Sequence, residues 1–490
     1  MSRANGSTTK MRTKMRDGSA ALVLACALAC ALACSLACGP RQTVLAAGSA
    51  APPSQVVHPE WARNLAIYEV NLRQYSPGGT FKEFEQHLGR LHEMGVGILW
   101  LMPIHPIGEL NRKGTLGSYY SVRDYLAVNP EFGTMDEFKA LVAKIHDAGM
   151  YVIIDWVANH CAWDNPLTVE HPDWFTRDAS GRLKPPVPDW SDVVDLNYAN
   201  PDLGRYMIDA MKFWVAETGI DGFRCDVAEM VPLEFWAEAR AELDRLKPVF
   251  MLAEGEQPAL HERAFDATYG WELFKLMRKI AEGAGSAVDL WNYFDRNAVV
   301  YPEGAYRMYF TSNHDENSWN GTAGQFFGDG LEAFAVLTQT AQGIPLIYSG
   351  EEAGLPKRLA FFDKDSIAWR PHDLARLYTD LVRLKRTNKA LWNGEAGGAM
   401  VRVPTSNDGA VFAFMRVKDE CRVVVALNLS LRTQEVELRS KAAAGGYGDM
   451  STHKAVRLEK GTILKLKPWE YRVLVTPTRI TFPGTVGADR

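Results

Sequence analysis

Arg224 and Asp226 stand two residues apart in the segment G-I-D-G-F-R-C-D-V-A-E (219–229), where an apolar run becomes polar. On an extended strand, residues two apart point to the same face, so the guanidinium and the carboxylate would lie side by side. An adjacent cation keeps a carboxylate ionised, which suits a nucleophile. Taken alone, the two residues are equally typical of a structural ion pair at a strand end.

The same change from apolar to polar residues ends three more runs. D-W-V-A-N-H (155–160) follows one run, Glu254 follows V-F-M-L-A, and N-H-D (313–315) follows Y-R-M-Y-F-T-S. If these runs are parallel strands, one edge of the sheet receives a cluster of six side chains: Asp226, Glu254, Asp315, Arg224, His160 and His314. Two carboxyl groups flanking one bond are what glycoside cleavage needs, one to protonate the leaving oxygen and one to attack or to activate water. A third can stabilise the positive charge that develops at the sugar carbon.

Several of these residues have alternative interpretations. Asp155 is more typical of a structural carboxylate, bound to backbone or to Arg224, than of a catalytic one. Glu256 lies two residues beyond Glu254, so it shares the expected face and is the rival acid. Each histidine, taken singly, is typical of a buried, hydrogen-bonded side chain. The constellation favours function, because gathering three carboxylates on one face costs free energy.

The elements that must position these residues alternate between strand and helix. Residues 65–75 alternate as a strand, and a helix is predicted from residue 81 to a stop at Gly95. Capping boxes of the form T-x-x-E begin this helix and a second one, at 80–83 and 134–137. Strand and helix alternate in this way over about 320 residues, which favours a parallel sheet. The polar strand ends favour a (β/α)₈ barrel over residues 58–392 rather than a doubly wound sheet.

Two further regions and a tail accompany the predicted barrel. Residues 161–199 form a short insertion after the third strand. Residues 395–477 read as several strands with turn signals between them, which predicts an all-β sandwich domain. Residues 478–490 are expected to be a loosely ordered tail.

The N-terminal 1–47 segment is predicted to be an export signal and not part of the fold. A basic stretch precedes an apolar run at 19–38, and small residues around Ala46 and Ala47 suit signal peptidase. The protein is therefore expected in the periplasm or outside the cell. A retained membrane anchor and lipid attachment at one of the cysteines of this run stay open as alternatives. The net charge of −5, spread along the chain, gives no indication of nucleic-acid binding.

Four segments together resemble the signature regions of the α-amylase family, glycoside hydrolase family 13. They are D-W-V-A-N-H, G-F-R-C-D-V-A-E, M-L-A-E-G and T-S-N-H-D-E-N, in the family's order and spacing, within a resemblance over about 60–475. The resemblance implies that Asp226 is the nucleophile, Glu254 the general acid/base and Asp315 the transition-state stabiliser. It also implies that Arg224 keeps Asp226 charged.

The resemblance extends to sugar-binding side chains and to a metal site. It implies that His160 and His314 contact sugar hydroxyls and that Tyr120 stacks on the sugar, with Tyr119 as the competing assignment. It implies Ca²⁺ ligands at Asn159 and Asp195. Glu229 and Met230 stand where calcium-dependent members carry Lys and His, and methionine is a poor ligand for a hard cation, so calcium is the less favoured outcome.

Three functions remain open at this stage. The first is an exported retaining hydrolase of α-glucosidic bonds in starch-type oligosaccharides or polysaccharides. The second is a transglycosylase or isomerase of sucrose, trehalose or maltose, which shares the same covalent intermediate. The third is a non-catalytic carbohydrate-binding protein, which the intact set of carboxylates argues against. In all three the partner is an α-glucan or α-glucoside, a membrane contact comes only from an N-terminal anchor, and no oligomeric state is indicated.

Overall fold

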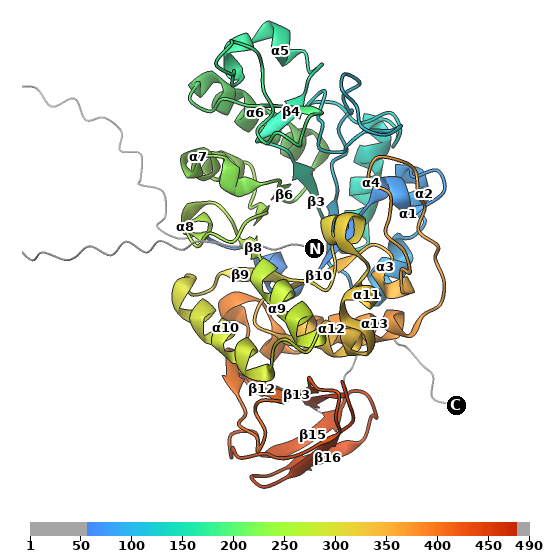
Figure 1. Cartoon of the computed structure of the whole chain (residues 1–490), viewed down its shortest axis with the longest axis vertical. Coiled ribbons are helices and arrows are strands. Elements are labelled where there is room, and N and C mark those ends of the chain that lie inside the picture. Colours follow the sequence, from blue (N-terminus) through green and yellow to red (C-terminus); the bar gives the residue numbers. More distant parts are fainter. Residues whose placement is uncertain (1–55, 478–490) are drawn as a thin grey trace, which may run out of the picture. The chain divides into compact units, whose positions relative to one another are not determined.

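The computed structural model describes residues 56–477, and a closed barrel of parallel strands lies at their centre (Figure 1). The barrel strands are β1 (Ile67–Val70), β2 (Ile98–Leu101), β3 (Tyr151–Trp156), β6 (Gly222–Cys225), β7 (Phe250–Ala253), β8 (Ala267–Tyr269), β9 (Tyr306–Tyr309) and β10 (Ile344–Tyr348). They follow one another around the barrel in chain order, and the ring closes between β10 and β1. The predicted (β/α)₈ barrel is confirmed.

Helices surround this barrel, and their ends follow from local sequence. The longer ones are α4 (Met135–Asp147), α6 (Pro201–Thr218), α7 (Leu233–Asp244), α9 (Trp271–Ala281), α10 (Ala287–Val300), α12 (Leu331–Thr340) and α13 (Asp373–Thr387). Thr134 and Glu137 form the predicted capping box of α4. The Asn200 side chain accepts a hydrogen bond from the second residue of α6, and Gly219 ends that helix at φ 78°, a conformation that favours glycine. The chain therefore re-enters the barrel at a fixed point before β6.

Two sequence-based expectations need correction, and one strand was missed. The strand predicted over 65–75 ends at Val70, because Asn71 caps a short helix, α1 (Leu72–Tyr75). The single helix predicted from residue 81 to Gly95 is two helices, α2 (Phe81–Glu85) and α3 (Leu88–Met94), the second of which ends at Gly95 as predicted. Strand β8 was not predicted, because its three residues are too few to show a period.

The insertion after β3 contains little regular structure. It holds β4 (His160–Ala162), α5 (Leu167–Glu170), the 3₁₀ turn η2 (Pro172–Trp174) and β5 (Val193–Asp195). β4 and β5 pair antiparallel, with His160 opposite Asp195. The insertion thus places His160 beside the barrel mouth.

The C-terminal strands form two layers of antiparallel sheet. They are β11 (Met400–Arg402), β12 (Val411–Lys418), β13 (Cys421–Asn428), β14 (Gln434–Glu437), β15 (Gly445–Asp449), β16 (Ala455–Leu458), β17 (Ile463–Leu466) and β18 (Tyr471–Thr476). Six of them pair in the order β11-β12-β13-β18-β15-β16, and β14 pairs with β17. One face of the larger sheet packs on the barrel helices, where the Phe412 ring lies 4.4 Å from that of Trp291. The predicted all-β domain is confirmed.

Two predicted segments, 1–47 and 478–490, lie outside the described residues. Among residues 56–477, no helix combines the length and the apolar character needed to cross a bilayer.

Candidate active site

The three carboxylates come from the carboxyl ends of three barrel strands. Asp226 directly follows β6, Glu254 directly follows β7, and Asp315 lies in the loop after β9, at the start of the π-helical turn η4 (Glu316–Asn320). All three line one cleft of about 580 Å³, together with Tyr120, His160 and His314. The structure therefore brings together the side chains that the sequence grouped.

The Arg224 guanidinium contacts three of the carboxylates at once. Its Nη1 donates to Asp226 Oδ1 at 3.1 Å and to Asp155 Oδ1 at 2.9 Å, and its Nη2 lies 2.8 Å from Glu254 Oε2. The guanidinium is fully buried, and the charges of Asp155 and Glu254 outweigh burial and raise its pKa. It is a permanent cation shared by the group, and Asp155 has the structural role expected of it.

Glu254 lies close enough to Asp226 to influence the protonation of Asp226. Burial and the negative charge of Glu254 raise the pKa of the Asp226 carboxyl, while Arg224 opposes the rise. Both carboxyl groups contact the Arg224 guanidinium, so they are placed where one could attack a bound sugar and the other could donate a proton.

The backbone after Asp226 holds Glu254 in position. Val227 adopts a left-handed conformation, φ 37° and ψ 48°, which costs a β-branched residue about 1–3 kcal/mol. In this conformation the Val227 amide donates to Glu254 Oε2 at 2.8 Å. The chain therefore accepts strain at the point where Asp226 and Glu254 are held together.

His314 and Tyr120 form the end of a buried hydrogen-bonded chain. His314 Nδ1 donates to Glu69 Oε1 at 2.5 Å, and His314 Nε2 donates to the Tyr120 hydroxyl at 2.7 Å. That hydroxyl donates in turn to Asp155 Oδ2 at 3.1 Å. Burial opposes the imidazolium charge, but Asp315 and Glu69 outweigh it and raise the pKa of His314 to about 9. His314 is therefore a cation at neutral pH, fixed beside Asp315.

His160 is held in the opposite protonation state. Burial lowers the pKa of His160 to about 3, so the ring is neutral. Asn159 Nδ2 donates to His160 Nδ1 at 3.2 Å, which leaves the ring proton on Nε2. His160 Nε2 lies 3.8 Å from Asp226 Oδ2. A sugar hydroxyl bound between them would find a donor in His160 and an acceptor in Asp226.

The structure decides between two pairs of alternatives. Tyr120 lines the cleft, whereas the Tyr119 hydroxyl donates to Asn71 Oδ1 at 3.0 Å, away from it. The Glu256 carboxylate is paired with Arg307 Nη2 at 2.9 Å and does not line the cleft. Tyr120 and Glu254 are therefore the members of each pair that can reach a substrate.

The residues predicted to bind calcium have other contacts. Asn159 is oriented by His160, as described. Burial raises the pKa of Asp195, while a hydrogen bond with Thr176 and the charge of Lys184 oppose part of this rise. Nowhere in 56–477 do three His, Cys, Asp or Glu side chains gather closely enough to hold a metal. Ca²⁺ takes about six to eight oxygen ligands, including backbone and asparagine carbonyls, so the calcium ligands Asn159 and Asp195 stay a prediction.

Sequence reasoning missed several side chains at the site. Glu69 could have been found, because it is a lone charge in the apolar run I-Y-E-V. The others lie on loops after β2, β3, β9 and β10, where no periodicity marks them: Lys113, Trp190, Asp192, Trp319, Phe361 and Phe362.

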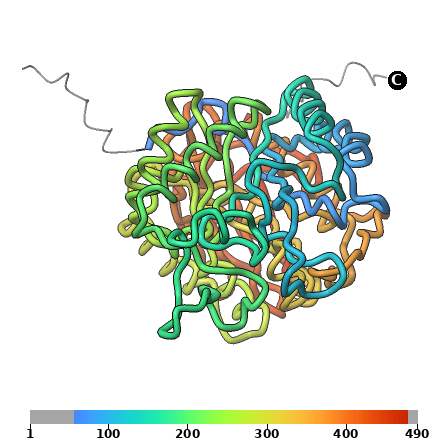
Figure 2. Tube along the Cα trace, turned by 90° about the horizontal axis from the view of Figure 1, so that it is seen from above, coloured from blue at the N-terminus to red at the C-terminus, as the bar shows by residue number. Residues whose placement is uncertain are grey.

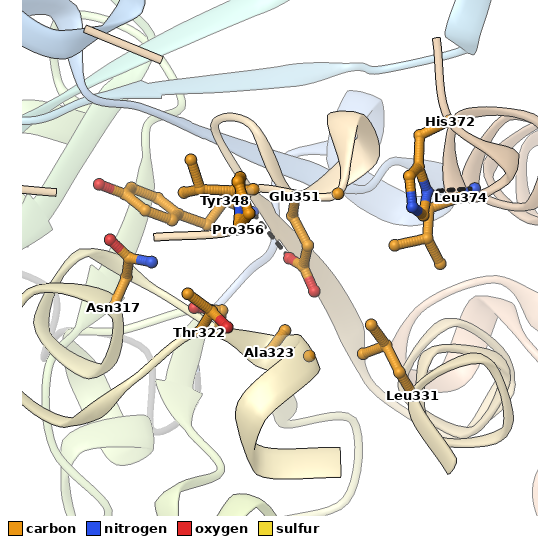
Figure 3. Close-up of a pocket in the computed structure, with 13 residues that line it drawn as sticks. Asn317, Thr322, Ala323, Leu331, Tyr348, Glu351, Pro356, His372 and Leu374 are labelled. Carbon is orange, nitrogen blue, oxygen red and sulfur yellow. Dashed lines mark hydrogen bonds between the residues drawn. The ribbon is translucent and has the colours of Figure 1, made fainter. Parts of the chain in front are cut away.

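A second, smaller cavity lies behind the loop that carries Asp315. Its volume is about 150 Å³, and Ser312 and Asn317 of that loop line it. Figure 3 shows the Glu351 carboxylate pointing between Ala323 and Leu331. Burial raises the pKa of Glu351 to about 7, although Thr311 and other donors lower it. This cavity borders the loop that carries Asp315, but none of Asp226, Glu254 and Asp315 lines it.

Barrel enzymes that cleave glycosidic bonds carry paired carboxylates at this end of the sheet, and the protein belongs to that class of glycosidases. More narrowly, the chain is a member of the α-amylase family, because the family's "Alpha amylase, catalytic domain" matches residues 60–190 and 187–376. The predicted family is confirmed.

Solved structures and relatives of the family resemble most of the chain. The maltogenic α-amylase AmyB of Thermotoga neapolitana is 32% identical with a TM-score of 0.75, over 85% of this chain and 97% of that one. An α-amylase of Lactobacillus plantarum is 32% identical with a TM-score of 0.76, over 85% and 99%. The α-amylase MalA of Haloarcula japonica is 27% identical over 81% of this chain, which spans 60% of that protein's length.

Proposed function

We propose that the protein is a retaining hydrolase of α-glucosidic bonds in starch-type oligosaccharides or polysaccharides. The observation that carries the proposal is the guanidinium of Arg224 contacting both Asp226 and Glu254 at the barrel mouth. This contact holds two carboxyl groups at one bond, where one can attack and the other can protonate. The amylases among the family members compared above also support it.

The reaction takes place in two displacements. A carboxylate oxygen of Asp226 attacks C1 of the sugar, the C1–O bond breaks, and the leaving oxygen takes its proton from Glu254. Water then attacks C1, gives a proton to Glu254 and releases Asp226 as the free carboxylate. Asp315, next to the His314 cation, stabilises the positive charge that develops at C1 in both steps.

Transfer to a second sugar instead of water is the alternative reaction. A relative that supports it is the α-1,4-glucan:maltose-1-phosphate maltosyltransferase of Rhodospirillum rubrum, 28% identical over 78% of this chain. Both reactions share the glycosyl-enzyme and differ only in what intercepts it.

Product analysis tests the proposal. Maltoheptaose, pullulan, sucrose and trehalose would be incubated with the protein and with the Asp226→Asn variant, and the products separated by chromatography. We expect glucose or short maltooligosaccharides from the wild type and a loss of about 10⁴-fold or more in the variant. Longer or rearranged products would favour transfer or isomerisation. Equal behaviour of wild type and variant would favour the binding protein.

Export is part of the same proposal. It rests on the basic and apolar N-terminal residues 1–47 alone. Fractionation of cells that express the full chain, with N-terminal sequencing of the product, tests it: a periplasmic or extracellular protein beginning near residue 47 is expected.

A further inference from the structure

We propose that Lys113 closes the non-reducing end of the cleft and so restricts the enzyme to releasing one or two glucose units from chain ends. The inference rests on the proposed hydrolase function and names the substrate end that this site accepts. The glycone is the part of the substrate on the non-reducing side of the cleaved bond, and it carries the reacting carbon C1.

The order of strands in the barrel gives the direction in which the glycone extends. Glu254 follows β7, and β1 lies opposite β7 in the ring, between β10 and β2. Because the acid must lie beside the leaving oxygen, the leaving group lies on the β7 side. The glycone therefore extends toward the loops that follow β2, β3 and β10.

Lys113 joins these loops across the end of the cleft. Its Nζ lies 2.9 Å from Asp192 Oδ1 and donates to the Asp189 carbonyl at 2.8 Å. Its ammonium also lies 6.0 Å from the ring centroid of Phe362. One side chain from the loop after β2 thus contacts the loops after β3 and β10.

The three loops are also fixed to one another without Lys113. The Leu116 amide donates to the Phe362 carbonyl at 2.9 Å, and Ser121 Oγ donates to the Asp192 carbonyl at 2.9 Å. Figure 2 shows the light-blue segment after β2 and the orange segment after β10 side by side. The Asp192 side chain is only 7% exposed. The wall is therefore a built part of the cleft and not a chance contact of a long surface side chain.

The space before this wall suits a short glycone. Phe361 lies nearly parallel to Tyr120, 10° apart with centroids 6.1 Å distant, and Trp319 lies 5.0 Å from Phe361. These rings continue the apolar surface of Tyr120, on which an apolar face of a sugar could pack. The whole cleft, which also includes the leaving-group side at Glu254 and Val227, has a volume of about 580 Å³, so only part of it is open to the glycone.

The test compares two versions of p-nitrophenyl maltoheptaoside, one open and one with an ethylidene group on its terminal non-reducing glucose. We expect the wild type to hydrolyse the open substrate to glucose or maltose and the blocked one about 100-fold more slowly, because the group meets the wall. In Lys113→Ala the ratio of blocked to open rates should rise about tenfold. Asp192→Asn, which keeps the volume but loses the ion pair, should shift the ratio in the same direction.

Lys139→Ala is the matched control, because Lys139 pairs with Glu217 at 3.1 Å and does not line the cleft. Its ratio should equal that of the wild type. Similar wild-type rates on both substrates, or an unchanged ratio in both cleft variants once circular dichroism shows them folded, would overturn the inference while leaving the hydrolase intact. Hydrolysis of neither substrate would overturn the proposed function and the inference with it.

Discussion

Arg224 is the residue on which the other site residues depend most. It is fully buried and contacts Asp155, Asp226 and Glu254, so its charge compensates several carboxylates at once. In Arg224→Lys a compact ammonium cannot reach all three positions that the planar guanidinium reaches. Leaving buried charge uncompensated should lower the free energy of unfolding by about 3–5 kcal/mol.

Urea unfolding measures this loss, and turnover of p-nitrophenyl maltoheptaoside should fall with it. Arg296→Lys is the control, since Arg296 is half exposed in its pair with Glu272 and should change stability by about 0–1 kcal/mol. If Arg224→Lys unfolded at the same urea concentration as the control, the central role given to the guanidinium would be wrong.

The charge of His314 makes stability depend on pH on the alkaline side. The pKa of His314 is raised to about 9, against about 6.5 in an unfolded chain. The stabilisation is therefore complete below about pH 6.5 and is lost as pH rises through about 9, by up to about 3 kcal/mol. Chemical unfolding over this interval should give a steep fall for the wild type and a flatter curve for His314→Asn. Parallel curves would show that the imidazolium is not stabilised in the fold.

Among the elements, the turn after β10 carries a second pH-dependent group, Glu351, at the cavity of Figure 3. Burial raises the pKa of Glu351 to about 7, so the folded state keeps a proton that the unfolded chain loses near pH 4.3. Stability should therefore fall by about 4 kcal/mol as pH rises from about 4.3 through 7. Glu351→Gln should remove this slope, as followed by thermal unfolding, whereas Glu238→Gln on the exposed side of α7 should keep it. A wild-type slope in Glu351→Gln would assign the titration to another group.

The elements also show what the sequence could and could not predict. Arg224 and Asp226 were predictable as neighbours, because two-residue spacing on a strand fixes their direction whatever surrounds them. Lys113 was not, because its contact with Asp192 depends on how three loops meet after the barrel closes. Strand β8 was missed since three residues carry no period, although the barrel needs it between β7 and β9.

At the scale of the whole described chain, the C-terminal sheet and the barrel share one apolar core. Phe412 of β12 packs on Trp291 of α10, and Trp469 packs on Phe334 of α12. Because these rings are buried between the two regions, separating the regions would expose apolar surface on both. We therefore expect the barrel and the sheet to unfold together.

Arg416 tests this coupling, because it is a fully buried cation of β12 that bonds to barrel carbonyls instead of to carboxylates. Its Nη1 donates to the Ala341 carbonyl at 2.8 Å, and its Nη2 donates to the Trp392 carbonyl at 2.7 Å. Arg416→Met would leave these acceptors unpaired, at about 1–3 kcal/mol each, while relief from burying a charge offsets part of the loss. The net loss should be about 3 kcal/mol, and tryptophan fluorescence and far-ultraviolet circular dichroism should still report one coincident transition.

The control is Arg457→Met, which removes an exposed pair with Glu459 and should cost about 0–1 kcal/mol. If the two signals separated in the wild type, the sheet would be an independent unit. A loss in Arg416→Met no larger than in the control would mean that the apolar contacts alone join it to the barrel.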